Sequence, residues 1–280
     1  MESEYSILIE GELAKAHVEA AEAAMASQPG HASITGVRIG TAVTSIGKAG
    51  DDNTTAPFVD KITLTSVTFK DPANSLCETV GARAFDGCSN LTGTLTIPAS
   101  LVELGTDAFA ICNLTGLTFA GVPTIATIDV NAFYDNTNLG GTLAVPASVG
   151  AINASAFANC NLTGLTFDGV PTIAIIDASA FSNNPLAGTL TLPNTIEVLG
   201  DQAFQNAEFT TVTFTGGTAV AFAVSGTPAF GAPFNIGSAA SLTPTPSLPG
   251  PPEITSLFTL TTFTDTTLKT ARDAGTVTFT

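Results

Sequence analysis

Residues 113–126 read NLTGLTFAGVPTIA, and residues 161–174 read NLTGLTFDGVPTIA. The two segments differ at one position, Ala120 against Asp168, and lie 48 residues apart. A segment that recurs at a fixed offset is typical of repeat architectures, in which stacked units bury a core that no single unit can bury. The length and internal pattern of the repeat therefore decide the fold of this protein.

The dipeptide Ala-Phe marks each repeat. Its phenylalanine recurs every 23 to 26 residues, at Phe85, Phe109, Phe133, Phe157, Phe181, Phe204 and Phe230. Phe58, in the segment TAPFVD, fits the series as a degenerate earlier member. The 48-residue offset between the two near-identical segments therefore covers two repeat units.

Each unit has the same pattern around this anchor phenylalanine. It begins with apolar residues that alternate with Thr, Gly or Ala, as at Leu95 and Ile97, and this period of two predicts a strand with one buried face. A turn with proline and a second apolar stretch, such as 102–104, follow before Ala-Phe. Because such strands stack across units, the sequence predicts a mostly β solenoid of about eight coils, each of 23–27 residues.

Two other positions recur in every unit. The residue four before the anchor is Gly, Asp or Asn, which predicts a positive φ angle or a turn cap: Gly81, Gly105, Asp129, Asn153, Asp177 and Gly200. The residue three after the anchor is small and usually polar, which predicts a buried ladder that bonds to loop backbone: Cys88, Cys112, Asn136, Cys160, Asn184 and Ala207.

The repeat resembles the BspA-type leucine-rich repeat, whose units combine an LTSITIP-like strand, a VTSIG-like stretch and an AFxxC anchor. The matching segments are LTSVTFKDPANSLCETVGARAFDGC (64–88), LTGTLTIPASLVELGTDAFAIC (91–112) and TAVTSIG (41–47). The resemblance covers about 200 residues. It implies a leucine-rich-repeat solenoid and a role in surface adhesion and protein or matrix binding, without a catalytic signature.

The ends of the chain differ from the repeats. We expect an N-terminal helical cap over 1–33, with a helix from Glu10 to Ser27, and a solenoid over 34–232. A Pro-rich linker or arm over 233–252 and a C-terminal β element over 253–280 follow. Two alternatives stay open for each end, because either segment can cap its own solenoid or dock on a partner or a neighbouring subunit.

Charge and hydropathy exclude several classes of partner. The net charge is −16, and eight Lys and Arg residues cannot build the basic face that nucleic acids or anionic membranes require. The sequence also lacks an apolar run long enough to span a membrane and a recognisable secretory signal. We therefore expect an intracellular, virion or non-classically exported protein, kept soluble by its acidic surface or bound to a cationic partner.

The sequence does not indicate catalysis, a metal or a cofactor. Its two histidines, His17 and His31, lie outside the repeats and match no catalytic or ligand spacing. Asp129 and Asp177 are better explained as turn residues than as paired carboxylates, because glycine takes the same position elsewhere.

The cysteines also match no known motif. No CxxC pair occurs among the four cysteines, which are Cys77, Cys88, Cys112 and Cys160. Buried free thiols are the favoured interpretation, with a disulfide between Cys88 and Cys112 as the alternative, because these two occupy equivalent positions in adjacent coils.

The outward side of the predicted strands is the candidate binding face. Each strand has two outward positions, and one of the two is threonine in almost every strand. The threonines of the candidate face are Thr68, Thr94, Thr96, Thr118, Thr142, Thr166, Thr189, Thr191, Thr211 and Thr213. Threonine is also simply a good strand residue that faces solvent. The first functional hypothesis is a non-catalytic adhesion or assembly scaffold for a protein partner, with self-assembly through the C-terminal arm. The alternative is a Thr-lined face that binds ice or polysaccharide.

Overall fold

The computed structural model describes residues 5–7, 11–26, 34–48, 50–52, 54–215 and 242–243. The chain is mostly β, with one helix in the described part, and its strands form a β solenoid. It divides into two compact units, Met1–Gly140 and Gly141–Thr280. The number of coils and the assignment of end caps remain predictions.

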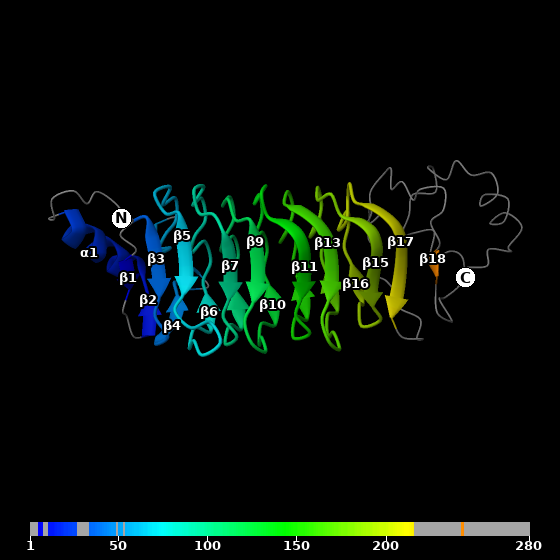
Figure 1. The fold of residues 1–280 in the computed structure, drawn as a ribbon, viewed down its shortest axis with the longest axis horizontal. Coiled ribbons are helices and arrows are strands. Elements are labelled where there is room, and N and C mark those ends of the chain that lie inside the picture. The colour runs from blue at the N-terminus through cyan, green and yellow to red at the C-terminus, as the bar shows by residue number, and fades with distance from the viewer. Residues whose placement is uncertain are drawn as a thin grey trace, which may run out of the picture. The chain divides into compact units, whose positions relative to one another are not determined.

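The first unit has two stacks of parallel strands, visible as neighbouring arrows in Figure 1. One stack lines the candidate face and contains β1 (Tyr5–Ile7), β3 (Gly36–Ile39), β5 (Ser66–Phe69), β7 (Thr94–Ile97) and β9 (Gly116–Phe119). The other contains β2 (Gly11–Leu13), β4 (Val43–Ile46), β6 (Thr79–Val80), β8 (Glu103–Leu104) and β10 (Thr127–Ile128). Each coil therefore contributes one strand to each stack.

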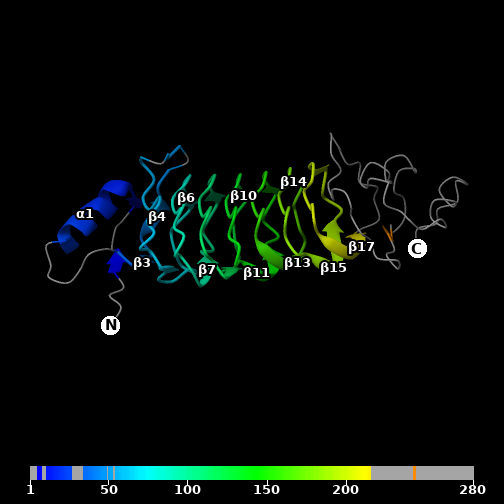
Figure 2. The ribbon, with the colours of Figure 1, turned by 90° about the horizontal axis from the view of Figure 1, so that it is seen from above.

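The second unit repeats this arrangement. Its long strands are β11 (Gly140–Val145), β13 (Asn161–Phe167), β15 (Ala187–Pro193) and β17 (Glu208–Thr215), followed by β18 (Leu242–Thr243). Its short strands are β12 (Ala151–Ile152), β14 (Ile175–Ile176) and β16 (Val198–Leu199). Seen from above in Figure 2, the coils of this unit lie side by side with their long strands along one edge.

The N-terminal segment differs from the predicted helix. The helix α1 covers Lys15–Ala26, whereas residues 11–13 form β2 and pair in parallel with β4. The predicted start at Glu10 is therefore wrong. Gly11 has a φ of +84° and Leu13 is fully buried, so strand pairing overrides the helix propensity of this segment.

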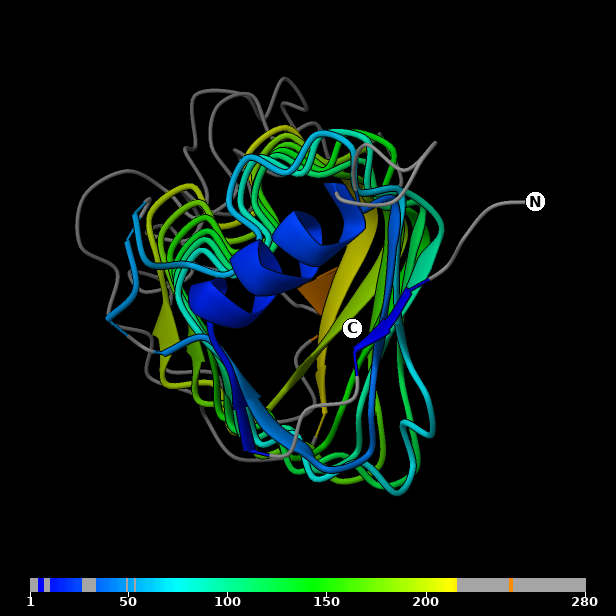
Figure 3. The ribbon, with the colours of Figure 1, turned by 90° about the vertical axis from the view of Figure 1, so that its left-hand side faces the viewer.

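Helix α1 crosses the end of the first coils in the end-on view of Figure 3. A hydrogen bond from the Ala14 amide to Nδ1 of His17, at 3.1 Å, caps the start of the helix. Val18, on its inner side, is buried. His17 is exposed and acts as a capping residue, as expected for a histidine outside the repeats.

The anchor phenylalanines form a stacked row through the core of each unit. In the first unit the ring centroids of Phe58, Phe85, Phe109 and Phe133 follow one another at 4.9, 4.8 and 5.7 Å, with nearly parallel rings. In the second unit Phe157, Phe181 and Phe204 stack at 5.4 Å per step. The inclusion of Phe58 in the series is confirmed, whereas Phe230 lies outside the described residues.

Backbone hydrogen bonds join the anchor turns of successive coils. The amide of Phe85 donates to the carbonyl of Ala108 at 2.8 Å, and the amide of Phe109 donates to Ala132 at the same distance. Each anchor from Phe85 to Phe204 has a residue with positive φ two positions before it and another two positions after it, as at Asp107 (56°) and Ile111 (53°). The residues four before these anchors have no positive φ, so that half of the prediction is wrong, whereas the turn-cap alternative holds at Asp129 and Asp177.

Glycine occupies that earlier position for a different reason. A Cβ atom on Gly105 would lie 2.8 Å from the backbone nitrogen of Ala82, and Gly81 and Gly200 are crowded in the same way by backbone of the preceding coil. The coils approach each other so closely at these glycines that a side chain would clash. Glycine is needed there for its small size and not for its conformational freedom.

The predicted domain boundaries remain predictions. Most of the Pro-rich segment 233–252, and all of 253–280, lie outside the described residues. The described exception is β18, which pairs in parallel with β17.

Candidate binding face

The threonines on the long strands of the first unit reach the surface. Thr68, Thr94 and Thr118 are exposed and Thr96 is half-buried. β7 and β9 pair in parallel with Thr96 opposite Thr118, and their hydroxyl oxygens lie 3.1 Å apart. The sequence pattern therefore placed these four side chains correctly on the outward side of their strands.

The second unit presents an equivalent row. Thr142 on β11, Thr166 on β13, and Thr189 and Thr191 on β15 are all exposed. Thr211 and Thr213 lie opposite Thr189 and Thr191 in the parallel register of β15 and β17, but their side chains are outside what the structure describes.

Glycines interrupt the threonine rows at two positions. A Cβ atom on Gly116 would lie 2.8 Å from Oγ1 of Thr94, and one on Gly164 would lie 2.7 Å from Oγ1 of Thr142. The threonine of one coil thus leans over the glycine of the next. Each glycine makes room for the threonine of the preceding coil.

The face is also interrupted between strands. In the first unit β1, β3 and β5 form one sheet and β7 and β9 another. In the second unit β11 and β13 are separate from the sheet of β15, β17 and β18. The rows of threonine are therefore regular over pairs or triplets of strands, and not over one continuous ladder within either unit.

A cation adjoins this face in the first unit. Arg38 on β3 is exposed and stands opposite Thr68 in the parallel register of β3 and β5. Arg38 is absent from the predicted face, although its place between apolar Val37 and Ile39 was the available signal for an outward position.

Buried side chains three residues after each anchor hold the loops beneath the face. The Nδ2 group of Asn136 donates to the carbonyls of Phe109 and Phe133 at 2.7 and 3.0 Å, and its Oδ1 accepts from the amide of Leu114 at 3.2 Å. Asn184 makes the same three kinds of contact in the second unit. The predicted ladder is confirmed, and it fixes each loop to the coil before it.

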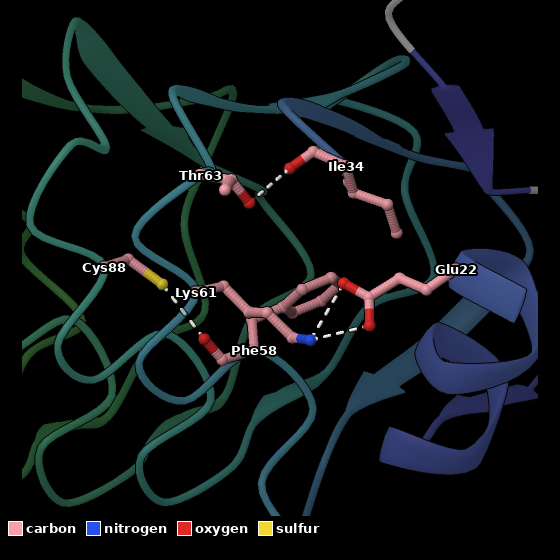
Figure 4. Close-up of polar contacts among 6 residues, drawn as sticks. All are labelled: Glu22, Ile34, Phe58, Lys61, Thr63 and Cys88. Atoms are coloured by element: carbon pink, nitrogen blue, oxygen red, sulfur yellow. Dashed lines mark hydrogen bonds and ion pairs between the residues drawn. The ribbon is translucent and has the colours of Figure 1, made fainter. Parts of the chain in front are cut away.

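Cysteine fills the same position with fewer bonds. The thiols of Cys88 and Cys112 donate to the carbonyls of Phe58 and Phe85 at 3.0 and 3.2 Å. Figure 4 shows the first of these contacts. All four cysteines are free and buried, which confirms the thiol interpretation over the disulfide.

Other threonines have a structural role that the sequence analysis missed. The hydroxyl of Thr124 donates to the carbonyls of Ala99 and Leu101, both at 3.1 Å, and Thr172 donates to Ala147 at 2.8 Å. These side chains tie the proline turns at Pro123 and Pro171 to the coil before them. A threonine directly after the turn proline is the sequence signal.

One carboxylate of the first unit has a raised pKa. Asp86 is half-buried, and this burial raises its pKa to about 6. The Asp107 carboxylate adds to the rise, Arg83 opposes it, and Asp60 adds a smaller contribution. A guanidinium nitrogen of Arg83 lies 3.3 Å from Oδ2 of Asp107.

The described residues contain no group of three His, Cys, Asp or Glu side chains arranged to hold a metal ion.

The two aspartates at the Gly position serve their own turns. Oδ1 of Asp129 accepts from the amide of Val130, and Oδ1 of Asp177 accepts from the amide of Ala178, both at 2.7 Å. Oδ2 of Asp129 also accepts from the hydroxyl of Thr106 at 3.0 Å. These bonds support the turn interpretation over that of a carboxylate pair.

Comparison with known sequences places this geometry in a family. The profile of the BspA type leucine rich repeat region matches in six copies, over residues 55–187 and 168–221. The chain belongs to the BspA-type leucine-rich repeat family. The stacked anchors and the Asn and Cys ladder are thus this chain's version of the leucine-rich-repeat fold, as its resemblance implied.

Other comparisons add little to this assignment. No curated protein matches the sequence. Among solved structures, the chain is similar to a leucine rich cell surface protein from Faecalibacterium prausnitzii, with 21% identity and a TM-score of 0.38. The match covers 71% of this leucine-rich-repeat chain and 60% of that one. Within the described residues, no helix is both long and apolar enough to cross a membrane.

Proposed function

We propose that this leucine-rich-repeat chain is a non-catalytic scaffold that binds a protein partner through its threonine-rich long-strand face. The observation that carries the proposal is the in-register arrangement of outward threonines on paired strands, as at exposed Thr118 and half-buried Thr96. Family membership supports it, because leucine-rich repeats typically serve as protein-binding scaffolds. Adhesion at a cell surface or assembly in a virion is the role that such a scaffold would fill.

The chemistry of the face favours a protein over a sugar. Its described outward positions carry small or polar side chains, Arg38, Asn161 and Glu208 among them, and no aromatic ring on which a sugar could stack. The chain's net charge of −16 favours a partner with a basic surface and disfavours nucleic acid.

The experiment compares matched face variants of the full chain. Thr96→Arg with Thr118→Arg adds bulk and charge to the long-strand face, and Thr79→Arg with Thr127→Arg does the same on the short strands β6 and β10. We expect the wild type and the short-strand variant to retain the same cross-linked partner and the long-strand variant to lose it. Equal retention by both variants would refute the assignment of the face.

Ice or polysaccharide binding is the second candidate. It is favoured by the repeated Thr-x-Thr pattern, as at Thr189 and Thr191, whereas the breaks between sheets oppose it. Ice recrystallisation in the presence of the wild-type chain tests the first version. Unchanged crystal growth at high protein concentration eliminates it, and a glycan array tests the second.

A further inference from the structure

Among the described residues, the two edges of β17 differ in how much of their length is paired. On one side, seven residues of β15, from Ala187 to Pro193, pair with β17 between Glu208 and Thr215. On the other side, the described pairing is confined to Val212 with Leu242 and Thr213 with Thr243 of β18. Two residue pairs are all that the described part of the chain places along this outer edge.

The short strand β18 continues the register of the coils. Leu242-Thr243 stands opposite Val212-Thr213, which in turn stands opposite Leu190-Thr191 of β15. The Pro-rich segment therefore contains one more copy of the aliphatic-Thr dipeptide of the long strands. Pro244 follows at once, and because proline has no amide hydrogen, it cannot extend the pairing.

The edge that β18 covers is prone to associate. β17 reads EFTTVTFT, which is rich in aromatic and β-branched residues, has a single charge at Glu208, and contains neither proline nor lysine. Sheet edges of this composition are templates for strands of other chains unless something covers or charges them.

We propose that the outer edge of β17 is a self-association surface whose partner is β17 of a second copy of this chain, and that β18 keeps this surface closed. Two copies of the same edge pair antiparallel about a two-fold axis, so each provides the other's partner strand. Pairing of β17 with the chain's own β18 is favoured over pairing with a second copy, because only 26 residues, 216–241, separate β18 from β17 in the chain. Such a tether gives a local concentration on the order of 1 mM, well above micromolar protein. This inference is independent of what the threonine face binds.

The test is size-exclusion chromatography with light scattering on the full chain over a range of concentrations. Leu242→Pro removes the amide and the backbone freedom of β18, and Leu248→Pro makes the same change in the same arm outside β18. We expect the wild type and Leu248→Pro to be monomers and Leu242→Pro to reach at least twice the monomer mass as concentration rises. A monomeric Leu242→Pro, or association of the wild type or of Leu248→Pro, overturns the proposal.

A third variant separates edge pairing from misfolding. Thr210→Lys and Thr215→Lys, added to Leu242→Pro, place positive charges on β17 that repel across a two-fold pairing. We expect this variant to return to the monomer mass. Association that persists despite the two lysines also overturns the proposal, because aggregation of a misfolded chain would not depend on the edge of β17.

Discussion

The carboxylate of Glu22 holds the ammonium group of Lys61 with both oxygens, at 2.8 and 2.7 Å from Nζ. Glu22 belongs to α1 and Lys61 follows the anchor Phe58, so the ion pair joins the helix to the first coil that carries an anchor (Figure 4). Each side chain is 29% exposed. The ion pair therefore fixes α1 to the coil of Phe58, which carries the first ring of the stacked row in this unit.

We expect this ion pair to have a measurable coupling energy. A double-mutant cycle with Glu22→Gln and Lys61→Met should give about 1 kcal/mol in the free energy of unfolding, since the pair is bidentate and only partly solvated. The matched control is Lys48 with Glu12, which is 3.4 Å long and more exposed. A coupling no larger than that of the control would show that the pair does not hold the helix.

The anchor Phe133 should be essential to the core. It is fully buried and stacks on Phe109, so Phe133→Ala opens a cavity that the neighbouring rings cannot fill. We expect a loss of about 3–5 kcal/mol in chemical denaturation. A loss below about 1 kcal/mol would be incompatible with a buried, stacked ring.

The buried Asn136 offers a graded test of the ladder. Asn136→Leu leaves the carbonyls of Phe109 and Phe133 and the amide of Leu114 without this partner, at about 1–3 kcal/mol for each group that stays unpaired. Asn136→Cys should destabilise less, because cysteine donates to the corresponding carbonyl in neighbouring coils. Equal losses for the two variants in urea melts would contradict this role.

The pKa of Asp86 predicts a pH dependence of stability. Burial raises this pKa to about 6, so the folded state binds the proton more tightly than the unfolded state does. The contribution of Asp86 to the free energy of unfolding should therefore increase as the pH falls from 7 through about 6 toward the ordinary carboxyl pKa. Thermal melts of Asp86→Asn should lack this increase.

The control for the pH experiment comes from the repeat itself. Asp168 is exposed, and the equivalent residue in the near-identical segment is Ala120. The variant Asp168→Ala should keep the pH dependence of the wild type. If Asp86→Asn and Asp168→Ala respond to pH in the same way, general charge repulsion rather than the site of Asp86 is the cause.

The cysteines should be inert in the native protein. Burial raises the pKa of Cys77 and Cys88 to about 12, and that of Cys112 well above its ordinary value. We expect no reaction with a thiol reagent in the folded state and four reacting thiols in denaturant. Rapid labelling of the native chain at neutral pH would contradict the buried positions.

Much of this fold follows from the sequence alone. The recurrence of Ala-Phe fixes the repeat length, and the alternation around residues such as Leu95 and Ile97 fixes which side of each strand is buried. Outward Thr96 and Thr118 and ladder residue Asn136 are predictable for the same reason. Each depends only on local periodicity, and local periodicity survives in every stacked coil because each coil meets the same neighbours.

The tertiary structure decided what depends on contact between coils. Only the approach of backbones explains why Gly105 lacks a side chain, and only strand pairing explains why residues 11–13 are not helical. The pairing of β18 with β17 likewise joins segments that lie 26 residues apart in the sequence. A single sequence records the pattern within a coil, whereas distances between atoms of different coils exist only after the chain has folded.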